Sequence, residues 1–278
     1  MSQITAADVA KLREMTGVGM MDCKKALAEA KGDLSAAVDI LRKKGRATAA
    51  VKSVREAKEG SITQYIAPGG KLGVLVEVNS ESDFVARNEL FRAFCEEAAK
   101  RLAADANASL ETEREALVAK IRENIKIARY ARMEVKGNGL IAGYIHTGAK
   151  VGVLVEVGAG KAETVAKDEF KQLVKDITLQ IAAGHPHVVS REQVPANVVA
   201  KEKEIAAEQV KNKPPQAIAK IVEGKLEKFY QAYCLVDQGF VKRNSEVSLK
   251  EHMAQIAKQL GDEITIRRFV RFQVGESA

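Results

Sequence analysis

The residues that could carry chemistry in this chain are few, and most lack the partners that their chemistry requires. Gly158-Ala159-Gly160-Lys161 follows an apolar run but does not have the GxxxxGK[ST] spacing of a phosphate loop. His185-Pro186-His187 offers two imidazoles, whereas a closed metal site takes four ligands. No HExxH, CxxC or nucleophile-elbow motif is present. The sequence therefore predicts no catalytic residue, no nucleotide site, no metal and no cofactor.

The remaining candidate is a loop in which an acidic residue stands beside a large aromatic residue. Asp83 and Phe84 lie between an alternating apolar run at 71–78 and a helical pattern that begins near Asn88. Phenylalanine is mostly buried in proteins, which favours a core position for Phe84. An exposed ring beside a carboxylate would instead suit insertion into a pocket of a partner protein, as binding hot spots do.

A duplication in the chain favours the second interpretation. Residues 71–78 read KLGVLVEV and residues 150–157 read KVGVLVEV, so seven of eight positions are identical at an offset of 79 residues. The loop after the second copy, 158–165, reads GAGKAETV and contains no aromatic residue. Because the two copies predict the same structural unit, the unmatched Phe84 is expected to project and to have a functional role.

The positive charge of the chain is concentrated in one segment. Residues 42–58 hold seven Lys or Arg and one Glu, which leaves 37 basic and 36 acidic residues elsewhere from totals of 44 and 37. Charge runs are usually solvated, which predicts a helical linker. Contact with RNA or an acidic partner is the alternative, since phosphates attract Lys and Arg. Nucleic-acid readout also favours aromatic residues, which make up only 5% of the chain.

Cysteine usage and hydropathy indicate where the protein works. The chain has three cysteines, Cys23, Cys95 and Cys234, in apolar surroundings and without paired spacing. An odd number of isolated thiols favours the reducing cytoplasm, with all three packed and unreactive. No apolar run is long enough for a membrane span, and the N-terminal residues do not resemble a secretory signal. We therefore expect a cytoplasmic protein with no membrane association.

Hydrophobic periodicity predicts an α+β fold with an N-terminal three-helix bundle and two related core units. In the bundle, spacing predicts that Met21, Ala26 and Leu27 point inward and that the third helix ends at Gly45. Each core unit is expected to hold an antiparallel β-hairpin followed by a helix. Two charged helical segments flank a Pro-Pro turn and predict an antiparallel helical hairpin that projects as a coiled-coil arm. The expected divisions are the bundle at 1–45, a basic linker at 46–59, core units at 60–136 and 137–278, and the arm inserted at about 188–230.

Three motifs resemble the bacterial elongation factor Ts family. Residues 16–27, TGVGMMDCKKAL, resemble its N-terminal module, which has a ubiquitin-associated-like fold. Residues 82–86, SDFVA, resemble its Thr-Asp-Phe-Val loop, with Ser82 in place of Thr. The closing residues 271–276, RFQVGE, and the doubled core also fit. The resemblance covers essentially the whole chain.

The resemblance implies a guanine-nucleotide exchange factor for elongation factor Tu, not an enzyme. Phe84 would wedge between helices of the GTPase near its nucleotide and magnesium site, and Asp83 would fix the loop or bond the partner. Ser82 would keep a hydroxyl hydrogen bond of the family's Thr, and Val85 completes the motif. The further partner contacts implied are Met21 and Lys24 in the N-terminal module, and His146, Phe240 and Val241 in the second core unit.

Two other functions remain open from the residues. An adaptor would bind a partner protein through residues 1–45 and use the core as a scaffold, but this leaves the Phe84 asymmetry unexplained. A protein associated with RNA or the ribosome would use the basic segment. Salt separates this last class from a wedge, because phosphate binding weakens steeply as salt rises.

Overall fold

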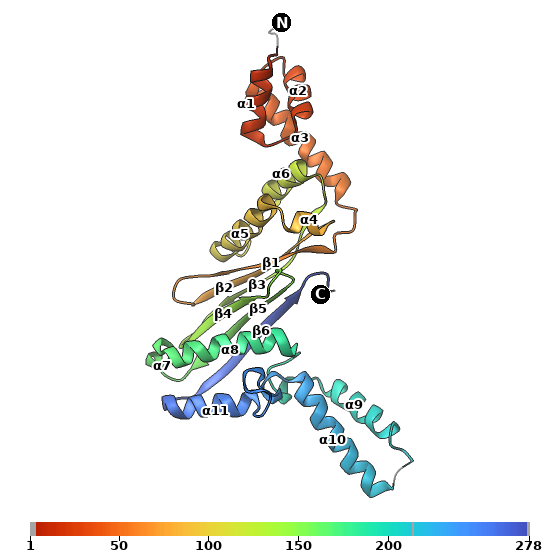
Figure 1. Ribbon diagram of the computed structural model, residues 1–278, viewed down its shortest axis with the longest axis vertical. Coiled ribbons are helices and arrows are strands. Elements are labelled where there is room, and N and C mark those ends of the chain that lie inside the picture. The colour runs from red at the N-terminus through yellow and green to blue at the C-terminus, as the bar shows by residue number, and fades with distance from the viewer. Residues whose placement is uncertain (1–3, 213, 277–278) are drawn as a thin grey trace.

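The computed structural model describes residues 4–212 and 214–276. At one end of the elongated molecule lies a bundle of three helices (Figure 1), α1 (Ala6–Thr16), α2 (Met20–Glu29) and α3 (Leu34–Lys52). Thr5 and Asp8 form a capping box at the start of α1. Leu12, Cys23 and Leu27 are fully buried in the small core that the three helices share.

The third helix is longer than the sequence predicts. The expected end at Gly45 is wrong, because α3 continues to Lys52 through part of the segment interpreted as a linker. Gly45 is buried against α6 (Glu111–Ile121), where an added Cβ would lie 3.2 Å from the Ala119 side chain. Glycine therefore serves here as a point of close helix approach and not as a helix terminator, and the contact joins the bundle to the core.

The core contains two three-stranded antiparallel sheets of equal topology. The order is β1-β2-β3 in one and β4-β5-β6 in the other. Both middle strands have a register shift at the same point, between Glu77 and Val78 and between Glu156 and Val157. The predicted duplication is therefore confirmed, and it includes this irregularity in strand pairing. The strands are β1 (Glu59–Ile66), β2 (Leu72–Ser80), β3 (Ile125–Glu134), β4 (Gly139–Ile145), β5 (Val151–Ala159) and β6 (Ile264–Gln273).

The sheets pack face to face, and the helices α5 (Glu89–Ala104) and α8 (Asp168–Gly184) cover their outer faces (Figure 1). Ile62, Leu75, Ile141 and Leu154 meet between the sheets in one buried cluster. Ile62 donates its backbone N–H to Ala149 O at 2.8 Å, and Ile141 donates to Gly70 O at 2.7 Å. These two bonds are related by the 79-residue offset. The two sheets are thus related by approximate two-fold symmetry. Their shared buried cluster and these hydrogen bonds join the two core units into one α+β body.

The helical hairpin projects from the end of the molecule opposite the bundle (Figure 1). It consists of α9 (Ala196–Glu208) and α10 (Pro215–Tyr233). At its base, Arg191 donates to both Glu227 carboxylate oxygens at 2.7 and 2.8 Å and to Asp237 at 2.8 Å. The guanidinium also lies over the Tyr230 ring at 4.7 Å. One arginine thereby fastens the arm to the core.

Two short helices after the middle strands were not predicted. α4 (Asp83–Ala86) follows β2, and α7 (Ala162–Ala166) follows β5. The expected Asp83–Phe84 loop is therefore one helical turn, and its counterpart in the second unit has the same form. The last α-helix, α11 (Leu249–Leu260), begins at the predicted capping box of Ser248 and Glu251. None of the helices in the described ranges combines the length and apolar character of a membrane span.

Candidate partner-binding site

Phe84 is the most prominent apolar side chain on the first core unit. Its side chain is 79% exposed on α4, whereas the next two residues, Val85 and Ala86, are buried in the core beneath. A single helical turn cannot bury three consecutive residues on one side, because successive positions are rotated by about 100°. Anchoring Val85 and Ala86 therefore directs Phe84 outward. Of the two alternatives for this ring, burial in the core or projection from the surface, the structure shows projection.

The chain on both sides of α4 is held by hydrogen bonds. After the turn, Arg87 N donates to Phe84 O at 3.2 Å and Asn88 N donates to Val85 O at 2.9 Å. The Asn88 side chain then caps α5 by accepting from Leu90 N at 2.9 Å. The ring of Phe84 is therefore displayed from a segment that is tied directly to the start of a core helix.

Before the turn, Ser82 is held by an acidic residue from a distant part of the chain. Ser82 N donates to Glu123 Oε2 at 2.9 Å, and Ser82 Oγ donates to Glu123 Oε1 at 2.7 Å. Hydrogen bonds to an ionised carboxylate are stronger than those between neutral groups. The hydroxyl that the sequence singled out thus has a defined partner within the protein itself.

A second acidic residue joins this loop to the segment that follows α3. Glu81 accepts from Asn124 N at 2.6 Å and pairs with Arg55 at 3.3 Å. Asn124 is buried and donates its side-chain N–H to Arg55 O at 2.6 Å. The Asn124 amide, and then Arg55, hold the pKa of Glu81 below its ordinary value. The loop, the segment after α3 and the residue before β3 therefore form one hydrogen-bonded unit.

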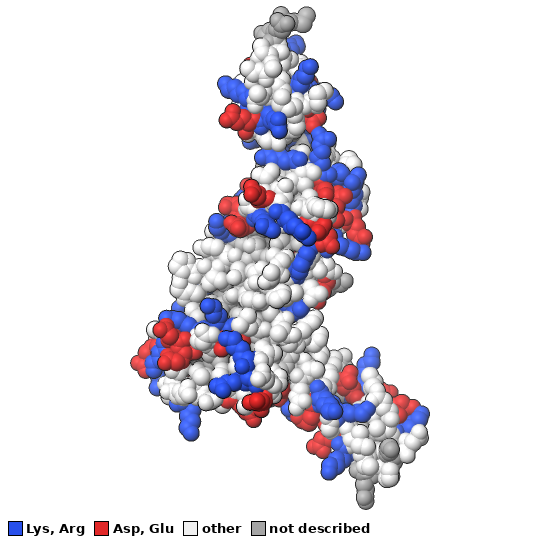
Figure 2. Space-filling model, in the orientation of Figure 1, with Lys and Arg blue, Asp and Glu red and all other residues white. Residues whose placement is uncertain are grey.

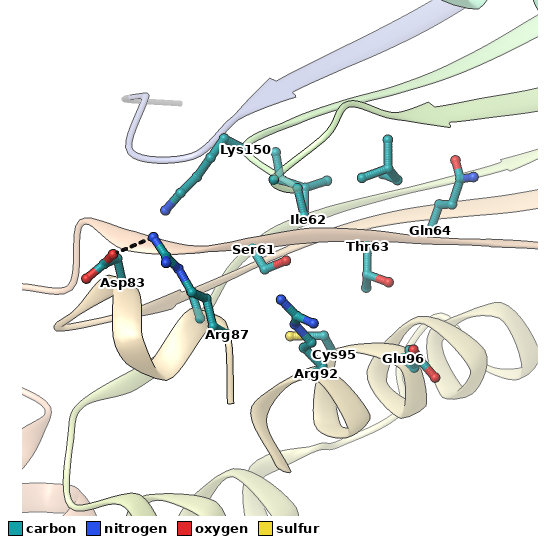
Figure 3. A pocket seen from close by; sticks show the side chains of 14 residues that line it. Ser61, Ile62, Thr63, Gln64, Asp83, Arg87, Arg92, Cys95, Glu96 and Lys150 are labelled. Carbon is teal, nitrogen blue, oxygen red and sulfur yellow. Dashed lines mark hydrogen bonds and ion pairs between the residues drawn. The ribbon is translucent and has the colours of Figure 1, made fainter. Parts of the chain in front are cut away.

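Asp83 forms an ion pair with Arg87 at 2.9 Å, one turn apart on the exposed surface. The pair borders an open groove of about 620 Å³ whose opposite wall is the β4–β5 turn, with Lys150 (Figure 3). Arg92 of α5 also faces this groove, beside Cys95 and below the β1 residues Ser61 and Thr63. Exposed ion pairs contribute little stability. Asp83 thus fixes the turn only weakly in the free protein.

His146 lies on the hairpin turn that forms the far wall of this groove. The imidazole is exposed, and its Nδ1 is 2.9 Å from the Tyr144 hydroxyl. The turn is closed by His146 N donating to Val151 O at 2.9 Å. The two core units therefore bring Asp83 and the His146 turn to opposite sides of one groove, although 63 positions separate them in the sequence.

Met21 and Lys24 are both exposed on α2. Met21 has 65% of its surface accessible, so the inward position predicted from helical spacing is wrong for this residue, whereas Ala26 and Leu27 are fully buried as predicted. Met15 and Met20 are also exposed nearby in the sequence. Large apolar side chains at the surface are typical of interaction sites when they cluster.

Phe240 and Val241 differ sharply in accessibility. Phe240 is only 1% exposed and stacks on His252 with a centroid separation of 4.4 Å. A ring in this position cannot reach a partner surface, so the expected contact through Phe240 has to be withdrawn. Val241 is 41% exposed, and its N–H donates to Gln180 Oε1 at 2.9 Å. Phe240 therefore anchors the segment that displays Val241.

The chain is similar to known proteins over almost its whole length. Residues 81–276 match the family model described as Elongation factor TS. The Elongation factor Ts of Symbiobacterium thermophilum is 44% identical over 285 aligned residues, covering 99% of this chain and 93% of the relative. That of Clostridioides difficile is 45% identical over 293 residues, covering 99% and 94%. That of Nautilia profundicola is 43% identical over 291 residues, covering 99% and 94%.

The chain belongs to the elongation factor Ts family. Its role is therefore that of a translation elongation factor. The resemblance proposed from the motifs at residues 16–27 and 82–86 is confirmed by matches that extend far beyond them.

In this elongation factor Ts family member, acidic neighbours neutralise much of the basic segment. Four of its seven cations form ion pairs, Lys44–Glu29 at 2.6 Å, Arg46–Glu115 at 3.1 Å, Arg55–Glu81 at 3.3 Å and Lys58–Glu56 at 2.6 Å. Figure 2 shows basic and acidic residues interspersed, with a largely uncharged area over the sheets. The segment thus does not form a continuous cationic surface on this face, which weakens its interpretation as an RNA site.

Sequence reasoning overlooked Glu123, Glu81 and Asn124, which hold the α4 turn. Isolated acidic residues near helix ends carry no motif, and their partners lie 26 to 43 positions away in the sequence. The internal repeat contained one usable signal, since an acidic residue stands two positions before the third strand in each copy, Glu123 before β3 and Asp262 before β6. Within the described ranges, no group of three His, Cys, Asp or Glu side chains could hold a metal ion.

Proposed function

We propose that this protein is a guanine-nucleotide exchange factor for elongation factor Tu, acting in the cytoplasm, and that Phe84 promotes GDP release. In this mechanism the Phe84 ring inserts between helices of the GTPase near its nucleotide and magnesium site. The contacts that hold GDP involve the phosphates and the magnesium ion. Displacing the elements that carry those contacts weakens nucleotide binding without any bond being made or broken by this chain.

The exposed and anchored position of Phe84 is the observation that carries the proposal. The ring has 79% of its surface free, while the next two residues, Val85 and Ala86, are buried. An aromatic anchor is typical of binding hot spots. Because α4 is already held by hydrogen bonds on both sides, little conformational freedom is lost when the ring enters a pocket.

Linkage explains how a binding protein can accelerate exchange. If the chain binds nucleotide-free elongation factor Tu more tightly than the GDP complex, the chain must weaken GDP binding by the same factor. The ternary complex is then unstable and releases one ligand or the other. The concentrations of GTP and GDP set the direction of exchange, so no general acid, base or nucleophile is required.

The remaining contacts extend the proposed surface. Met21 and Lys24 would meet the GTPase domain, and the His146 turn and Val241 would meet another domain of elongation factor Tu. Asp83 has two proposed roles, fixing the α4 turn through Arg87 or exchanging this weak ion pair for a hydrogen bond to the partner. The adaptor alternative would use the exposed methionines of the N-terminal module alone.

Stopped-flow release of a fluorescent GDP from elongation factor Tu tests the proposal. Release should accelerate with increasing concentration of the full chain and reach a plateau, and the plateau should persist at raised salt. A loss of acceleration with salt would instead support phosphate binding. No acceleration by a folded chain at any concentration would refute exchange activity and leave the adaptor function.

A further inference from the structure

We propose that Glu123 is a positioning residue for Phe84, a role that rests on the proposed exchange function. Its carboxylate holds the N-terminal end of α4 through two hydrogen bonds from Ser82. Through this contact, Glu123 sets the direction in which the ring is presented to the partner. The residue does not itself touch the partner in this mechanism.

The need for such a contact follows from the length of α4. The helix has four residues. A single turn is unstable by itself, because nucleation fixes several backbone angles for one hydrogen bond. Ser82 occupies the N-cap position, yet its side chain makes no capping bond to the turn. Its hydroxyl donates to Glu123 instead, so the usual local stabilisation is replaced by a contact from another part of the chain.

Glu123 is itself placed firmly. The preceding Arg122 ends α6 with φ of 64°, and its N–H donates to Val118 O at 2.8 Å. The following Asn124 is 4% exposed and is bonded to Glu81 and to the Arg55 carbonyl. A carboxylate fixed between two such neighbours can define the position of Ser82.

The second core unit contains the same contact without the aromatic ring. There, Lys161 N donates to Asp262 Oδ2 at 2.9 Å at the start of α7. Asp262 follows Gly261, the αL cap of α11, as Glu123 follows the αL cap of α6. The position equivalent to Phe84 is Glu163. The acidic contact is therefore a general device for holding the short helix, and only the first unit combines it with an exposed ring.

This comparison supplies a matched pair of variants in the full chain, Glu123→Ala and Asp262→Ala. Hydrogen–deuterium exchange should show faster exchange at the Arg87 and Asn88 amides in Glu123→Ala, because the turn they close loses its tether. Asp262→Ala should leave these amides unchanged. Circular dichroism would verify that both variants fold. Unchanged exchange at residues 87–88 in Glu123→Ala would overturn the proposal whatever the activity.

The kinetic test separates positioning from a structural role. In Glu123→Ala, the plateau rate of GDP release should fall about tenfold, the factor that corresponds to about 1.4 kcal/mol in a barrier. The concentration for half-maximal effect should change less, since the other contacts remain. Glu123→Gln should largely restore the plateau, because its amide can accept from Ser82 N and bond the hydroxyl. Asp262→Ala should keep the wild-type plateau.

A double-mutant cycle identifies the residue through which Glu123 acts. In a Phe84→Ala background, Glu123→Ala should lower the plateau by less than twofold, because the ring to be positioned is absent. A full tenfold loss in that background, or a wild-type plateau in Glu123→Ala alone, would overturn the proposal. If the wild-type chain does not accelerate release at all, the exchange function fails, and the amide exchange at residues 87–88 still decides whether Glu123 holds the turn.

Discussion

Replacing Phe84 with alanine should slow nucleotide exchange strongly while leaving the fold intact. The side chain is 79% exposed, so truncation removes few contacts within the protein. Substitutions at such sites usually change the free energy of unfolding by less than about 0.5 kcal/mol. The thermal unfolding midpoint should therefore stay within a few degrees of the wild-type value.

The effect on exchange follows from the area that the ring can bury in a partner. Complete burial of a phenylalanine side chain is worth about 1.5–3 kcal/mol. About four fifths of the ring is available, which gives about 1.2–2.4 kcal/mol. If this energy is used to drive GDP release, the plateau rate should fall about 8- to 60-fold.

The assay is stopped-flow release of fluorescent GDP from elongation factor Tu with saturating chain. Glu163→Ala is the matched control, because it alters the equivalent position on α7 and removes no ring. It should keep the wild-type plateau. A folded Phe84→Ala variant with a wild-type plateau would refute the wedge mechanism, and equal losses in both variants would show that the effect is not specific to the ring.

Three further outcomes test the surrounding structure. Gly152→Ala should destabilise the fold by about 1–3 kcal/mol in thermal unfolding, since the added Cβ would lie 2.4 Å from Ile62 Cγ2 between the sheets; an unchanged midpoint would contradict this packing. Glu81→Gln should lower the free energy of unfolding at neutral pH. The difference from the wild type should vanish as the pH falls below 4.5 and through the lower pKa that the backbone N–H of Asn124 gives Glu81 in the folded protein. A difference that persists in acid would show that the Glu81 carboxylate is not its cause. Burial raises the pKa of the Cys95 thiol to about 12, so iodoacetamide at mildly alkaline pH should label it only after unfolding, as peptide mass spectrometry would show.

The duplicated architecture was predictable because its signals are local. Alternation along 71–78 and 150–157 defines two strands with the same buried faces, and the repeat carries this conclusion from one copy to the other. Helix caps such as Ser248 with Glu251 also depend on residues three positions apart. Gly45 misled the prediction because glycine at a helix end and glycine at a close helix contact look alike in a sequence.

The candidate site was predictable only in part. The difference between the two copies indicated a functional role for Phe84, but the usual burial of phenylalanine predicted that its side chain lies in the core. The spacing of α2 suggested that Met21 is buried, whereas the bundle leaves it exposed. Phe240 was expected at the surface, yet packing against His252 buries it. In each case accessibility depends on which neighbouring element covers the residue.

The sequence by itself therefore determined the fold class, the repeat, the helical arm and the family, because these depend on periodicity and on motifs within short segments. The tertiary structure decided which side chains are exposed and what holds them. Ser82 and Glu123 are 41 positions apart, and Phe84 and the His146 turn lie in different core units. Such contacts arise when the two sheets pack and the residues after α6 meet the start of α4, and no local pattern encodes their distance or direction.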